Sequence, residues 1–152
     1  MKDALVKITF DVSDQSDSGF VTERLWSKAI GDDIYVIDNS PFQAYGISLG
    51  DKILAKNENG ELKFVNVVER GGHSTYRVRL PAGCDHNYFL QHWKKLEALG
   101  CTYEGASGEQ KLYSIDVPTI GNVPEVYRVL QAGEEAGTWE FEEAHYFRPG
   151  KT

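Results

Sequence analysis

The chain has 152 residues, 41% hydrophobic and 26% charged, which is enough to bury a core without disulfides. Its 23 acidic residues outnumber its 16 basic ones, and the net charge of −7 argues against nucleic acid or anionic lipid as a partner. The sequence contains no apolar run of about 18 residues and no signal-like start, so we expect a cytoplasmic protein without a membrane span.

The first half alternates between apolar and polar residues with a period of two, which predicts strands. The first strand has one apolar face, made of Val6, Ile8, Phe10 and Val12. A solvated polar loop is expected from Ser13 to Gly19. Further strands are predicted at 23–29, 34–38, 52–56 and 62–69. The Asn59-Gly60 pair suits a tight hairpin turn. Short antiparallel strands of this kind predict a small β-barrel or sandwich over residues 1–74.

The second half predicts strands and helices in alternation. After a strand at 75–81, Asp85 can cap a helix that ends at Gly100. The inward stripe of this helix is Phe89, Trp93, Leu96 and Leu99. Two strands follow, at 101–104 and 111–117. A second helix then begins after Asn122, has Pro124 in its first turn, directs Val126, Val129 and Leu130 inward and ends by Gly137. A final strand contains Trp139 and Phe141 and extends through Tyr146-Phe147.

This order of strand, helix, strand, strand, helix, strand is that of a ferredoxin-like sandwich. The sequence therefore predicts an α+β protein, with a small antiparallel β-barrel or sandwich at 1–74 followed by a ferredoxin-like βαββαβ subdomain at 75–152. The ferredoxin-like fold serves many functions, so it does not identify one.

Cysteines and histidines give no sign of a disulfide or a metal site. Cys84 and Cys101 flank a helix about 22 Å long, which would hold them too far apart for a disulfide, so two free thiols are expected. His86 and His92 are six residues apart and lie on different sides of the same helix, so they cannot ligate one metal. We expect neither a metal nor a cofactor.

Several short motifs resemble a bacterial family of about this length whose function is unknown. They are a Trp near the second strand, Asp-Asn-Ser-Pro-Phe at 38–42, Tyr-Gly at 45–46, Gly-Asp at 50–51 and Glu-Arg-Gly-Gly-His-Ser-Thr at 69–75. The resemblance covers the whole chain in outline and implies no established activity. In size and charge the chain is also similar to immunity proteins, which neutralise toxins inside the producing cell.

The segment 69–75 concentrates groups that could carry chemistry at the junction of the two halves. Glu69, Arg70, His73 and Ser74 are the candidate ligand-binding residues here. His73 could act as a general base, but neighbours on a strand point to opposite faces, so it cannot simply activate Ser74. The alternative is a bulged crossover in which these side chains satisfy unpaired backbone groups.

A second candidate ligand site follows the strand at 34–38. Asp38 and Asn39 could accept hydrogen bonds from a ligand, with Phe42 and Tyr45 as an apolar wall. The competing interpretation is a turn followed by an anchoring aromatic residue, because Asx side chains often bond their own backbone.

The clearest charge feature is a group of five carboxylates within ten residues near the C-terminus: Glu134, Glu135, Glu140, Glu142 and Glu143. On the last strand, Trp139 and Phe141 should face inward, whereas Glu140 and Glu142 should face outward. A solvated surface is one explanation, and a docking surface for a basic partner is the other.

These observations favour a non-catalytic protein-binding module, most concretely an immunity protein that blocks a basic, nuclease-type toxin through the five carboxylates. One alternative is a small-molecule-binding protein, hydrolase or transferase with its site around His73. Another is a dimeric regulatory module. We expect a monomer or a weak homodimer whose partner is a basic protein.

Overall fold

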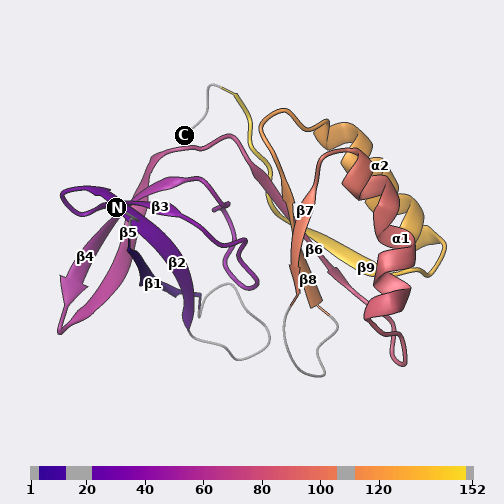
Figure 1. The fold of residues 1–152 in the computed structure, drawn as a ribbon, viewed down its shortest axis with the longest axis horizontal. Coiled ribbons are helices and arrows are strands. Elements are labelled where there is room, and N and C mark those ends of the chain that lie inside the picture. Colours follow the sequence, from indigo (N-terminus) through magenta and orange to yellow (C-terminus); the bar gives the residue numbers. More distant parts are fainter. Residues whose placement is uncertain (1–3, 13–21, 106–111, 150–152) are drawn as a thin grey trace.

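The computed structural model describes residues 4–12, 22–105 and 112–149. It contains nine strands and two helices in this part of the chain, so the predicted mixed α+β class is confirmed. The strands form two separate sheets (Figure 1). The loop predicted from Ser13 to Gly19 lies outside the described residues, as do residues 106–111.

The first five strands form one sheet, in the order in which they occur along the chain. They are β1 (Leu5–Asp11), β2 (Thr22–Gly31), β3 (Ile34–Ile37), β4 (Lys52–Glu58) and β5 (Glu61–Glu69). Successive strands are antiparallel, and a single parallel bridge between Thr9 and Lys63 joins β1 to β5, so the sheet closes. Asn59 and Gly60 have positive φ angles of 55° and 88°, as the predicted hairpin turn between β4 and β5 requires.

The remaining strands form a four-stranded antiparallel sheet in the order β7-β8-β6-β9. They are β6 (Ser74–Arg79), β7 (Thr102–Gly105), β8 (Leu112–Val117) and β9 (Glu140–His145). Helices α1 (His86–Ala98) and α2 (Val123–Glu135) cover the face of this sheet that is turned away from the closed sheet (Figure 1). The other face is therefore turned toward the first half of the chain.

Both helices begin at the residues that the sequence predicts. The Asp85 side chain accepts a hydrogen bond from the Tyr88 backbone N–H, and the Asn122 side chain accepts one from Glu125 N–H. Gly100 follows α1 with a φ of 90°, which suits a residue without a side chain. These local signals explain where each helix starts and where the first one ends.

Apolar side chains gather in two separate cores. One fills the closed sheet and includes Ile8, Phe10 and Ile53, each at most 2% exposed. The other lies between the four-stranded sheet and the helices and includes Phe89, Leu96 and Trp139. The division of the chain into subdomains at residue 74 remains a prediction.

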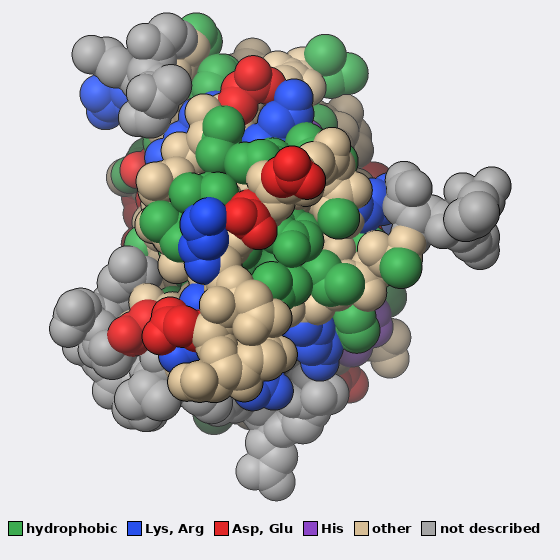
Figure 2. All heavy atoms as spheres, turned by 90° about the vertical axis from the view of Figure 1, so that its left-hand side faces the viewer, with side chains coloured by type: hydrophobic (Ala, Val, Ile, Leu, Met, Phe, Trp, Pro, Cys, Tyr) green, Lys and Arg blue, Asp and Glu red, His purple; other side chains and the backbone are tan. Residues whose placement is uncertain are grey.

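The outer surface of the closed sheet carries apolar side chains as well. Figure 2 shows hydrophobic side chains at the centre of this face, with charged side chains around them. Ile30, Val65 and Val68, which belong to β2 and β5, are 52%, 48% and 48% exposed. This surface lies on the side of the closed sheet away from the helices.

The last strand is shorter than predicted. β9 ends at His145, so Tyr146 and Phe147 lie beyond it. Phe147 N–H donates to Ser74 Oγ at 2.9 Å, so the chain beyond β9 still contacts β6. Within the described residues, no helix is both long enough and apolar enough to cross a membrane.

Candidate functional site

A buried polar face of the four-stranded sheet forms the candidate site. On β6, Thr75 and Arg77 alternate with Tyr76 and Val78, which belong to the core beneath the helices. Because successive strand residues point to opposite faces, the polar pair points toward the closed sheet. We call the buried or half-buried polar side chains of this region the polar seam: Ser48, Asp51, His73, Thr75, Arg77, Ser114 and Asp116.

His73 and Asp116 form a close contact within the polar seam. His73 Nδ1 lies 2.9 Å from Asp116 Oδ1 and 2.8 Å from Oδ2. The hydrogen bond to Asp116 raises the pKa of His73 above its ordinary value, although burial works in the opposite direction. Since Asp116 takes Nδ1, Nε2 is the ring nitrogen left to exchange a proton with a further group, and the His73 side chain is 20% exposed.

Two glycines place the His73 ring. A Cβ atom on Gly50 would lie 3.1 Å from His73 Cδ2, so the ring packs directly over this glycine. A Cβ atom on Gly71 would lie 2.3 Å from the carbonyl oxygen of Gly50, which is closer than real Cβ contacts. The two backbones can therefore approach because Gly71 has no side chain, whereas the missing side chain of Gly50 makes room for the His73 ring.

Asp51 anchors the loop that carries Gly50. Its carboxylate is fully buried and accepts hydrogen bonds from Ser48 N–H at 3.0 Å and from Gly71 N–H at 2.9 Å. Arg70 Nη1 donates to Asp51 Oδ2 at 3.0 Å and to the Gly46 carbonyl at 2.6 Å. The charge of Asp51 is thus compensated by one cation and two backbone donors, as a buried carboxylate requires.

The Ser48 hydroxyl joins the loop before β4 to β6 and to the edge strand β9. Ser48 Oγ lies 2.5 Å from Thr75 Oγ1 and 2.8 Å from His145 Nδ1. Burial, with a smaller effect of the nearby Arg70 charge, lowers the pKa of His145 below its ordinary value. Burial thus favours the neutral form of the His145 imidazole, whereas the contact with Asp116 favours the charged form of His73.

Arg77 ties the loop at 41–45 to β9. It is 2% exposed, donates from Nε to Glu142 Oε1 at 2.8 Å and from Nη1 to the Ala44 carbonyl at 2.9 Å. Its guanidinium also lies 4.6 Å from the centre of the Tyr45 ring. A planar group with five donors suits this task, because it reaches carbonyl and carboxylate oxygens together.

The structure separates the residues predicted at 69–74. Arg70 binds Asp51 and His73 binds Asp116, whereas Glu69 forms an ion pair with Lys52 at 3.0 Å and is 65% exposed. Ser74 accepts from Phe147 N–H, so it satisfies a backbone group and does not contact His73. Only Arg70 and His73 of this set face the polar seam.

The residues predicted at 38–45 have partners within the protein. The Asn39 side chain accepts a hydrogen bond from Trp26 N–H at 2.7 Å and donates one to the Glu104 carboxylate at 3.1 Å. Phe42 N–H donates to the Glu23 carboxylate, which also accepts from the next two backbone N–H groups. Tyr45 OH donates to Glu142 at 2.5 Å, whereas Asp38 is exposed.

The five predicted carboxylates occupy different surroundings. Glu142 binds Arg77 and Tyr45 at the polar seam, and Glu143 accepts from Tyr76 OH at 2.9 Å on the opposite face of β9. Glu134 accepts from Phe141 N–H. The side chains of the other two, Glu135 and Glu140, are exposed and form no hydrogen bond or ion pair with any described residue. The outward orientation predicted for Glu142 therefore leads to a contact with the first half of the chain.

The hollows described on the surface lie away from His73. The largest, with a volume of about 560 Å³, is between α1 and α2. Two smaller ones, of about 270 and 280 Å³, adjoin Arg79 on β6 and Tyr127 on α2.

Within the part of the chain that the structure describes, no three His, Cys, Asp or Glu side chains are arranged to hold a metal ion. Cys84 and Cys101 are free thiols, as expected.

Sequence reasoning missed the main partners in the polar seam. From the sequence, Asp51 was noted only in the Gly-Asp motif at 50–51, and Asp116 was not singled out. A signal for Asp116 does exist: together with Ser114 it alternates with Tyr113, Ile115 and Val117 in a fully buried strand. Buried polar residues at every second position indicate a strand with a polar partner on one face.

The fold and the polar seam define the class: an α+β protein in which a closed sheet and a helix-covered sheet are joined through buried polar contacts. The chain belongs to the family described as a domain of unknown function (DUF4265), whose model matches residues 23–141. The predicted resemblance to an uncharacterised family is thereby confirmed.

A solved structure shares this fold. It is described as a novel crystal structure of a hypothetical protein from Neisseria gonorrhoeae, and it superposes with a TM-score of 0.71 at 16% identity. The similarity covers 95% of this chain and 96% of that one. No curated protein matches the chain.

Proposed function

We propose that this protein is a non-catalytic binding module for a basic protein partner, most concretely an immunity protein that neutralises a nuclease-type toxin in the bacterial cytoplasm. The observation that carries the proposal is the pair of free carboxylates, Glu135 and Glu140, beside an edge strand in a chain of net charge −7. A field of this sign speeds association with a basic surface and selects partners of opposite charge.

The position of these carboxylates supports a docking role. β9 forms one edge of the four-stranded sheet, and Glu135 ends α2 shortly before it. An acidic edge strand also protects against pairing with a second sheet, which is the purely structural explanation. Binding of a partner would distinguish a docking role from protection of the sheet edge, because edge protection requires no partner.

The test is a pull-down of the tagged protein from its native lysate, after nuclease treatment, with washes at low and high salt. The double variant Glu135→Lys/Glu140→Lys changes the two free carboxylates without removing an internal contact. The matched control, Glu58→Lys/Glu97→Lys, makes the same change of charge at two exposed glutamates elsewhere. We expect a basic protein that is lost at high salt and from the first variant but is retained by the control. Equal recovery with both variants would reject this surface.

A second candidate function is favoured by the contact between His73 and Asp116. A carboxylate on Nδ1 orients the ring and leaves Nε2 as a base, which suits a small-molecule-binding protein, a hydrolase or a transferase. The test is native mass spectrometry after incubation with the small-molecule fraction of the cell's own lysate. An adduct on the wild type that is absent from His73→Gln supports this function, and no adduct on either protein counts against it.

We also infer a finer description of the fold. The closure of β1 on β5 supports a small β-barrel in the first half. The order β7-β8-β6-β9, with both helices on one face, supports the ferredoxin-like arrangement in the second half. Strand order in an experimental structure is the measurement that tests both.

A further inference from the structure

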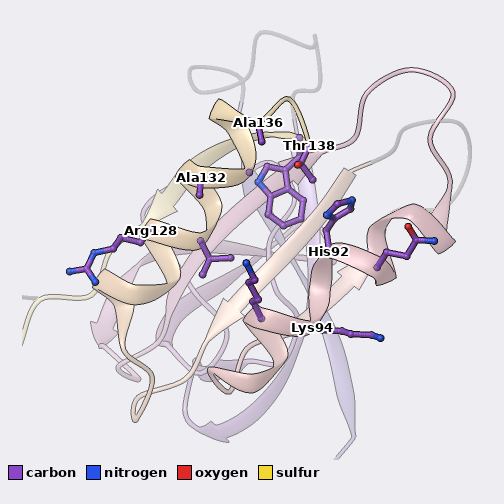
Figure 3. A pocket seen from close by; sticks show the side chains of 11 residues that line it. His92, Lys94, Arg128, Ala132, Ala136 and Thr138 are labelled. Carbon is purple, nitrogen blue, oxygen red and sulfur yellow. The ribbon is translucent and has the colours of Figure 1, made fainter.

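A groove between α1 and α2 has the features of a ligand site, and it is separate from the polar seam and from the free carboxylates. Its volume is about 560 Å³, within the range of about 300 to 1,000 Å³ that is typical of small-molecule sites. Figure 3 shows it from close by, with Ala132 and Ala136 on one wall and His92 on the other.

The floor of the groove is apolar and fixed in place. Trp139 is 3% exposed, and its indole Nε1–H donates to the Leu130 carbonyl at 3.0 Å. A Cβ atom on Gly133 would lie 2.5 Å from Nε1, so this glycine lets the indole pack against α2. Ala132 and Ala136 are one helical turn apart, and their short, exposed side chains line one wall of the groove next to the buried indole.

The rim of the groove is basic, opposite in sign to the chain as a whole. Lys94 and Lys95 line it from α1, and Arg128 lines it from α2. No Asp or Glu is among the lining residues, and neither lysine forms an ion pair with a described residue. Arg128 binds Glu125, is 72% exposed and extends away from the groove in Figure 3. Lys94 also points away from the groove in Figure 3, so its flexible side chain has to rotate to meet a ligand, whereas Arg128 would in addition have to leave Glu125.

We propose that this groove binds a small amphiphilic anion, with a carboxylate, sulfonate or phosphate head near Lys94 and Lys95 and a flat apolar body over Trp139. The wall from Val129 to Ala136 has eight residues, and the seven steps between them cover about 10 Å, which suits a small molecule better than a docked helix of several turns. The unpaired cations supply selectivity for the anion. Contact area comes mainly from the apolar side chains of Val129, Ala132 and Ala136, because Trp139 itself is 3% exposed.

The probes are two dyes with the same apolar body. 1-Anilinonaphthalene-8-sulfonate carries an anionic group, and N-phenyl-1-naphthylamine lacks it. Each is titrated into the full chain while dye fluorescence and energy transfer from tryptophan are recorded. We expect saturable binding of the sulfonate at one site, and weaker binding of the neutral dye.

Three variants locate the binding. Lys94→Gln/Lys95→Gln should weaken binding of the sulfonate by about three- to tenfold and leave binding of the neutral dye unchanged, because each exposed cation contributes modestly. Ala136→Leu fills the groove and should abolish the binding of both dyes at this site. Lys28→Gln/Lys63→Gln is the control, since it makes the same change of charge on the closed sheet.

Three results would overturn the proposal. Equal weakening by the control pair would show general electrostatic attraction. Binding that Ala136→Leu does not affect would place the dye elsewhere, for example on the apolar surface of the closed sheet. Binding that occurs only where light scattering detects a dimer would assign the groove to a second copy of the chain.

Discussion

His73 Nδ1 lies 2.8 Å from Asp116 Oδ2, and this contact joins the segment that enters β6 to the middle of the four-stranded sheet. The two residues are 43 positions apart in the chain. Because the carboxylate favours the charged form of the ring, the contact couples the protonation of His73 to the packing of the two halves.

Asp116→Asn should lower the pKa of His73, since the hydrogen bond to the carboxylate is the main reason that it is raised. An NMR titration of the histidine rings measures this change directly. Asp38→Asn, at an exposed position, is the control and should leave the titration of His73 unaltered. An unchanged His73 pKa in Asp116→Asn would contradict the assigned contact.

The same substitution should destabilise the protein most at acidic pH. A raised pKa contributes stability that is fully present below the unfolded value of about 6.5 and is lost as the pH rises through the folded value. We expect a loss of about 1.5 to 3 kcal/mol near pH 5, typical of a hydrogen bond to a charged group, and a smaller loss at high pH. Urea unfolding at both pH values measures the difference, and a loss that grows with pH would refute the sign.

His145 should show the opposite pH dependence. Its pKa is lowered mainly by burial, so the unfolded chain binds the proton more readily than the folded one. The stability that depends on neutral His145 is present above about pH 6.5 and is lost as the pH falls toward the folded value. His145→Gln should therefore make stability less sensitive to acid, as measured by thermal unfolding at a series of pH values. If the stability of the variant and of the wild type fell equally with falling pH, His145 would not be the cause of the acid sensitivity.

Gly71→Ala should reduce the free energy of unfolding by about 1 to 3 kcal/mol, because the added methyl group would overlap the backbone of Gly50. Gly31→Ala is the matched control, since its nearest contact would be an ordinary 4.0 Å from Ile34 Cβ. Chemical denaturation of both variants provides the comparison. Equal stability of the two would mean that the backbones at 50 and 71 are not so close.

Arg77→Met should destabilise the protein by about 1 to 3 kcal/mol or more, because the carbonyl of Ala44 would lose a buried donor. The lost ion pair adds less, since the Glu142 side chain is 46% exposed and can be solvated. Arg79→Met, two positions along the same face of β6 but exposed, should have little effect. Similar unfolding midpoints for the two variants would contradict the role given to Arg77.

Some of the structure followed from short-range features of the sequence. The capping residues Asp85 and Asn122, the Asn59-Gly60 turn and the apolar stripe of α1 were predictable because each depends on neighbours within a few positions. The end of β9 was misplaced, because it depends on a side chain of β6 that the local pattern does not reveal.

The sequence by itself therefore determined the elements, their caps and their apolar faces, since these depend on local periodicity and backbone preference. Only the tertiary structure decided the partners of the polar side chains. The pairing of β6 with β8 places Thr75 beside Asp116, and the loop before β4 brings Ser48 and Asp51 to the same seam. Such contacts join residues that are distant in the chain, so they form only after both sheets have found their registers.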